Sequence, residues 1–130
     1  MRLIDADVII WNWRGQEDAA SLLADSPFAV SAVTYMELVQ GMRNRREFAK
    51  LRADLKLWQV RLLPVTEPIL ARAVALVERY FLPHHVQLAD ALVAATALQH
   101  DLVLVSSNSK HFRPIQGLRL ERFRPRQYPV

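Results

Sequence analysis

Two aspartates, one residue apart, stand in an apolar run near the start of the chain, within RLIDADVII at residues 2–10. In an extended segment, residues two apart point to the same side, so Asp5 and Asp7 would project together. Burying unpaired carboxylates is costly, and two of them would repel each other and raise the pKa of one. A divalent cation such as Mg²⁺ or Mn²⁺, which prefers hard oxygen ligands, would relieve both penalties. The alternative, a turn residue that faces water, is equally good for Asp7, whereas for Asp5 we favour a functional role.

Two more acids stand in segments that are otherwise uncharged. Glu37 is the only charged residue between Phe28 and Met42. Taken alone, Glu37 is better explained by a capping box, in which it would reach back to the first amide of a helix that starts at Thr34. Asp90 is the only charged residue between 85 and 100. Asp90 could simply lie in the first turn of a helix, where the helix dipole favours a negative charge. However, a carboxylate in so apolar a helix needs a partner, which favours a metal ligand.

A polar loop, SSNSKHF at residues 106–112, follows an apolar strand segment. Ser106, Ser107 and Asn108 could each donate or accept hydrogen bonds there. Taken alone, this segment is better explained as an unremarkable polar loop. Its interest comes from its place after a strand, where α/β sheets form their sites.

Strand and helix patterns alternate along the chain and predict an α/β fold, with a mostly parallel sheet covered by helices on both faces. We expect one domain, 1–130, because the length suits one and no linker or repeat interrupts it. The predicted strands are 3–10, which runs into a turn, 26–33, 61–65, 102–105 and an edge strand at 118–123. The predicted helices are 16–25, 34–42, 45–58, one that is capped by Thr66 and buries a stripe of Leu70, Ala73, Val74, Val77 and Phe81, and 87–99. The end of the chain, RPRQYPV, is expected to be an irregular tail.

Composition narrows the functional classes. With no cysteine, neither a disulfide nor a thiolate metal site can form, and only three glycines argue against a phosphate-cradling loop. The absence of cysteine fits a reducing compartment, and Asp5 and Asp7 interrupt the apolar core that a signal peptide would need. We therefore expect a cytoplasmic protein with no membrane partner. The net charge of +4 suits an anionic partner, nucleic acid first.

A basic segment could bind the phosphates of such a partner. The predicted third helix carries six cations against only Glu47 and Asp54. The cations are Arg43, Arg45, Arg46, Lys50, Arg52 and Lys56. A phosphate track and an ordinary solvated face account for this pattern about equally well. Lys110 is a further candidate for binding RNA.

Together, LIDADVIIW, VSAVTYMELVQG, LADALVAATAL and LVSSNSKHF resemble, in this order, the PIN-domain ribonucleases, and among them the VapC toxins of toxin–antitoxin pairs. The resemblance implies a Rossmann-like sheet and a metal-dependent endoribonuclease. Asp5, Glu37 and Asp90 match the family's acids, which would hold Mg²⁺ or Mn²⁺, with Asn108 orienting water or phosphate. The resemblance also implies an RNA substrate, a homodimer and a cognate antitoxin that blocks the groove.

The chain departs from this family at the loop that often supplies a fourth acid, which here offers Asn108 and His111 instead. Asp7, where the family usually has Asn, could compensate, or one ion could suffice. This departure leaves open a PIN module that binds RNA or protein without cutting, whose affinity should survive EDTA. A poorer resemblance is to haloacid-dehalogenase-type phosphatases, in which Asp5 would be the nucleophile and Asp7 the acid. A phosphoenzyme trapped on Asp5 would favour that alternative.

Overall fold

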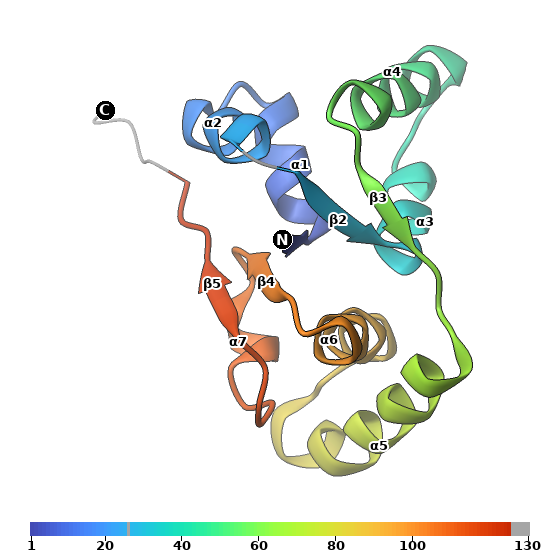
Figure 1. The fold of residues 1–130 in the computed structure, drawn as a ribbon, viewed down its shortest axis with the longest axis vertical. Coiled ribbons are helices and arrows are strands. Elements are labelled where there is room, and N and C mark those ends of the chain that lie inside the picture. Colours follow the sequence, from blue (N-terminus) through green and yellow to red (C-terminus); the bar gives the residue numbers. More distant parts are fainter. Residues whose placement is uncertain (26, 126–130) are drawn as a thin grey trace.

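A parallel sheet forms the centre of the computed structural model, which describes residues 1–25 and 27–125. Within these residues five strands pair in the order β3-β2-β1-β4-β5, all parallel, so that the first strand lies in the middle (Figure 1). Their bounds are β1 Arg2–Ile4, β2 Phe28–Ser31, β3 Arg61–Leu63, β4 Val103–Ser106 and β5 Leu120–Arg122. The predicted parallel sheet is therefore confirmed, with β5 as the predicted edge strand.

Helices cover both faces of the sheet, as predicted. They are α1 Ala6–Trp13, α2 Glu17–Asp25, α3 Ala32–Gln40, α4 Arg45–Leu57, α5 Glu67–His84, α6 Leu88–His100 and α7 Ser109–Phe112. Alternate strand residues face opposite sides. Leu3 and Leu104 therefore belong to a core with α5 and α6, whereas Ile4 and Val105 belong to a second core with α1, α2 and α4. Figure 1 shows α1 and α2 on one side of the sheet and α5 and α6 on the other.

The predicted strand at 3–10 is wrong beyond Ile4. Asp5 caps α1, and its side-chain Oδ1 accepts a hydrogen bond from the backbone N–H of Ala6 at 2.9 Å. Val8 and Ile9 are buried in this helix rather than in a strand. A short apolar run fits a buried strand and a buried helix equally well, so its periodicity could not separate them. Asp7 consequently lies in the first turn of α1, not two positions along an extended segment.

The capping role considered for Glu37 is also wrong. Helix α3 begins before Thr34, and its cap is Ser31, whose Oγ accepts a hydrogen bond from the backbone N–H of Val33 at 3.1 Å. Glu37 therefore lies well inside the helix, beyond the reach of a capping box. Its position needs another explanation.

The predicted apolar stripe on α5 is partly wrong. Ala73 is buried, but Leu70 is 51% and Val74 53% exposed, while Ile69 and Tyr80 are buried instead. Apolar residues occur on both sides of this helix, so their spacing did not fix which side packs inward. Thr66 does stand at the cap position, without a side-chain hydrogen bond.

Two features near the end of the chain complete the fold. The short helix α7 was not predicted, because its four residues fall in a segment that reads as a polar loop. The predicted irregular tail, 124–130, lies outside the described residues from 126 onward. Among the helices of the described part, none is both long enough and apolar enough to cross a bilayer.

Candidate metal centre

The carboxyl ends of the neighbouring strands β1 and β4 bring Asp5 and Ser106 together. The Oγ of Ser106 donates a hydrogen bond to Oδ2 of Asp5 at 2.9 Å. The backbone N–H of Asp5 donates to the carbonyl of Val105 at 3.0 Å, which fixes the strand ends relative to each other. Both side-chain oxygens of Asp5 thus accept a hydrogen bond, Oδ1 from the backbone N–H of Ala6 and Oδ2 from the hydroxyl of Ser106.

Asp7 contacts the same loop from the first turn of α1. Its Oδ2 accepts hydrogen bonds from the backbone N–H of Ser107 at 2.9 Å and from the Ser107 hydroxyl, which is in very close contact. Its Oδ1 is buried and has no hydrogen-bond partner. A buried carboxylate oxygen without a donor is costly, and a cation or an ordered water would satisfy it. Asp7 therefore holds the loop with one oxygen and has the other available.

The acids perturb one another electrostatically. Burial, and then repulsion from Asp7, raise the pKa of Asp5 from its usual 3.8 to about 7, against the hydrogen bonds from Ser106 and Ala6, with a smaller contribution from Glu37. Desolvation, followed by repulsion from Asp90, raises the pKa of Glu37. The four predicted acids therefore share one region of negative potential, although they come from α1, α3 and α6.

Asp90 has a histidine partner. The Nδ1 of His111 lies 2.8 Å from Oδ2 of Asp90, which joins the first turn of α6 to α7. Asn108 contributes to the site through its backbone, whose N–H donates to the Oγ of Ser106 at 3.0 Å. The side chain of Asn108 is exposed. From the sequence, His111 was considered only as a replacement for the missing acid. The spacing of His111 and Asp90 along the chain does not predict their contact.

The donor set suits a hard divalent cation. Carboxylate oxygens are its preferred ligands, and the raised pKa values of Asp5 and Glu37 mark negative charge that a cation would stabilise. Among the described residues, no three histidine or acidic side chains are gathered closely enough to hold one ion directly. The residues present therefore fit an ion that retains several water ligands, as Mg²⁺ commonly does.

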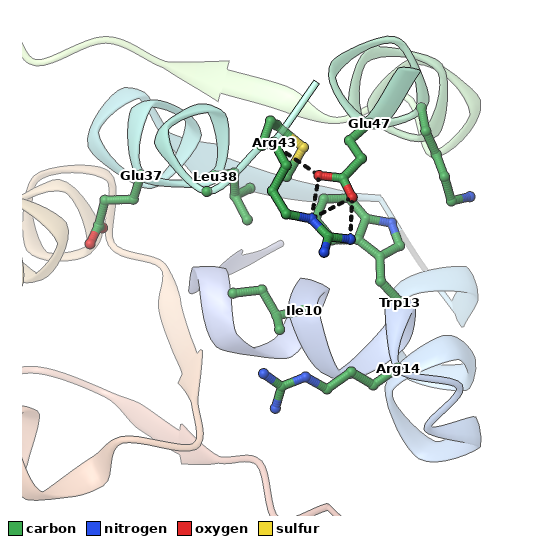
Figure 2. Close-up of a pocket in the computed structure, with 10 residues that line it drawn as sticks. Ile10, Trp13, Arg14, Glu37, Leu38, Arg43 and Glu47 are labelled. Atoms are coloured by element: carbon green, nitrogen blue, oxygen red, sulfur yellow. Dashed lines mark hydrogen bonds and ion pairs between the residues drawn. The ribbon is translucent and has the colours of Figure 1, made fainter. Parts of the chain in front are cut away.

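A groove of about 500 Å³ opens beside Glu37, between α1, α3 and α4. Figure 2 shows Glu37 at one end and the Arg43–Glu47 pair at the other, with Ile10 between them and Trp13 overlapping the pair in this view. Most of the surface that lines the groove is apolar. The groove therefore combines an apolar floor with charged residues at its ends.

The predicted basic residues are not all equally available. Arg43 precedes α4 instead of lying on it, and its guanidinium pairs with Glu47 at 2.7 Å. Lys50 lies 3.4 Å from Asp54, which also accepts a hydrogen bond from the indole of Trp13. In the described part of the chain, Arg46 and Lys110 form no ion pair, so their charges are less compensated.

The chain belongs to the PIN-domain family, whose model matches residues 2–118. Within that family, its relatives include VapC proteins. Ribonuclease VapC10 of Mycobacterium tuberculosis is 39% identical over 126 residues, covering 92% of this chain and 91% of the relative. A toxin–antitoxin complex from Klebsiella pneumoniae contains a chain that is 28% identical, with a TM-score of 0.76, covering 91% of this chain and 95% of that one.

A solved structure that shares less sequence identity with this chain shows its fold alone. A DNA-bound VapBC complex from Salmonella typhimurium has a chain with 20% identity and a TM-score of 0.78, covering 94% of this chain and 98% of that one. The comparisons confirm the predicted family and support the predicted function of a ribonuclease toxin. They also assign the paired aspartates to a PIN domain instead of a haloacid-dehalogenase-type phosphatase.

Proposed function

We propose that this VapC-type PIN domain is a divalent-metal-dependent endoribonuclease and acts as the toxin of a VapBC-type pair. The observation that carries the proposal is the shared negative potential of Asp5, Asp7, Glu37 and Asp90 at the carboxyl edge of the sheet. Such a group of acids is stable only with a cation or with protons. The 39% identity to a ribonuclease supports RNA as the substrate.

In this mechanism Asp5, Glu37 and Asp90 would hold Mg²⁺ or Mn²⁺, partly through water. When bound, the ion would acidify a water molecule and neutralise charge on the scissile phosphate. Asp5 is oriented for this role by Ser106 and by the amide of Ala6. Asp7 keeps the loop in place and offers its free oxygen as a further ligand. Asn108, whose backbone is held by Ser106, orients a water molecule or a phosphate oxygen with its exposed amide.

The direct test is RNA cleavage by the purified protein with Mn²⁺ and with excess EDTA. Wild type should cleave only with the metal, and Asp90→Asn should lower the rate by about three orders of magnitude or more, because electrostatic stabilisation of the transition state is lost. Asp25→Asn, an exposed acid on α2, is the matched control and should cleave normally. Equal cleavage by wild type and Asp90→Asn would assign the activity to a contaminant.

A second candidate function is the binding of RNA or protein without cleavage. It is favoured by the absence, among the described residues, of three side chains placed to hold an ion directly. The same assay separates the two functions. A binding module would retain its RNA affinity in EDTA and would never cleave, whatever metal is added.

RNA binding is proposed to rely on four cations: Arg43, Arg46 and Lys50 on or just before α4, and Lys110 on α7. Arg46 and Lys110 should contribute most, because Arg43 and Lys50 are already paired with Glu47 and Asp54. Replacing either residue with alanine should reduce the slope of log affinity against log salt by about 0.7, the value for one contact to single-stranded nucleic acid. Fluorescence anisotropy with the inactive Asp90→Asn background measures this slope. An unchanged slope in both variants would exclude this track.

The antitoxin is proposed to occupy the groove between α1, α3 and α4. The toxin–antitoxin complex among the structural matches supports a partner of this kind. The apolar floor and the charged ends suit an amphipathic segment, and Glu37 at one end would let that segment obstruct the metal centre.

A homodimer is proposed as well. It would bury apolar side chains that are exposed on α5, such as Leu70 and Val74.

A further inference from the structure

We propose that His111 is a positioning residue that holds the carboxylate of Asp90 in the orientation needed to bind the metal ion. The inference rests on the proposed function, since it takes Asp90 to be a ligand. Nothing in the family match assigns a role to this histidine. It stands in the segment 106–112, which contains no carboxylate.

The contact has the geometry of a charge-assisted hydrogen bond. Nδ1 of His111 lies 2.8 Å from Oδ2 of Asp90, and the imidazole donates this hydrogen bond in the tautomer that carries its proton on Nδ1. The side chains are 31% and 20% exposed, so solvent screens this pair less than an open surface pair. Because the imidazole holds Oδ2, the direction of the whole carboxylate of Asp90 is fixed.

The imidazole is presented from an anchored element. The next residue, Phe112, is only 1% exposed and packs into the core beneath the sheet. Ser109, at the start of α7, is also buried, and its carbonyl accepts a hydrogen bond from the backbone N–H of Arg113 at 2.8 Å. A side chain on such a support loses little further entropy when it holds Asp90.

The same segment also holds the other acids of the centre. Ser106 donates to Asp5, and Ser107 donates to Asp7. Residues 106–111 therefore contact three acids from other parts of the chain while contributing no carboxylate. These contacts orient side chains that are proposed to bind the metal ion. Hydrogen bonds that orient metal ligands commonly change metal affinity by about 10- to 100-fold.

A purely structural clamp between α6 and α7 is the competing explanation, and two measurements distinguish it. One is the Mn²⁺ affinity at fixed pH, from the electron paramagnetic resonance signal of free Mn²⁺. The other is the free energy of unfolding in urea with EDTA present. A clamp would change the second quantity alone, whereas a positioning residue changes the first.

Three substitutions give the decisive comparison. In His111→Asn the amide nitrogen takes the place of Nδ1, whereas in His111→Gln it takes the place of Nε2. We expect His111→Ala and His111→Gln to weaken Mn²⁺ binding about 10- to 100-fold, and His111→Asn to stay within about threefold of wild type. His100→Ala, which removes an exposed histidine at the end of α6, is the matched control and should bind normally.

The possible outcomes separate this inference from the proposed function. If Asp90→Asn loses Mn²⁺ binding while His111→Ala does not, the inference is overturned and the metal centre stands. If Asn and Gln at position 111 are equally impaired, orientation through Nδ1 is overturned. If Asp90→Asn binds Mn²⁺ as wild type does, the ligand role of Asp90 fails, and the inference fails with it.

Discussion

Asp5→Asn is expected to make the metal-free protein more stable at pH 8 while it abolishes RNA cleavage. The carboxyl group of Asp5 has a pKa of about 7 in the fold, against 3.8 as its ordinary value. Between these values the folded state binds a proton that the unfolded state has released, so stability falls as the pH rises from about 4 to 7. The loss in wild type is on the order of 4 kcal/mol when complete.

The asparagine variant escapes this loss because its amide cannot ionise. Its Oδ1 can still accept from the backbone of Ala6, and its amide nitrogen can donate to Ser106. Urea unfolding in EDTA at several pH values measures the difference in free energy of unfolding between variant and wild type. That difference should be near zero at pH 4 and grow until about pH 7.

Asp25→Asn, which removes an exposed carboxyl group on α2, provides the control. A constant difference between Asp5→Asn and wild type across the pH range would mean that Asp5 is not held in a destabilised, ionised form. The expected combination of higher stability and lost activity is typical of a site whose charges are arranged for function at a cost to the fold.

The acidic residues of the site could be singled out from the sequence because each stands in an apolar surrounding. Asp5, Glu37 and Asp90 are each conspicuous charges in segments that the fold largely buries. The parallel sheet was also accessible, because alternating strands and helices favour a parallel arrangement, whereas the order of its strands was not predicted. What brings the acids to one edge is therefore predictable from the pattern alone.

The details that failed share a physical cause, which is that local patterns have more than one solution. The run from Val8 to Ile10 fits a strand as well as it fits a helix. The start of α3 was misplaced because Ser31 and Thr34 are both good caps, and only the end of β2 decides between them. The contact between His111 and Asp90 could not be predicted at all, because it depends on how α7 packs against α6.

Mn²⁺ is expected to stabilise the wild-type protein more as the pH rises, whereas the metal-free protein becomes less stable as the pH rises. A ligand at 100 times its dissociation constant raises the free energy of unfolding by about 2.7 kcal/mol. The ion binds the ionised form of Asp5, so below a pKa of about 7 each pH unit should lower its apparent affinity roughly tenfold. At pH 5 most of the stabilisation gained at pH 8 should therefore be lost.

Thermal or urea unfolding with and without Mn²⁺, at pH 5 and pH 8, measures this effect. Asp5→Asn should show little stabilisation by Mn²⁺ at either pH, while Glu78→Gln, an exposed acid on α5, should behave as wild type does. Stabilisation of equal size at both pH values would place the ion away from Asp5. Both predictions for Asp5 then have the same cause. The negative charge that destabilises the metal-free protein above pH 7 is the charge that binds the metal ion.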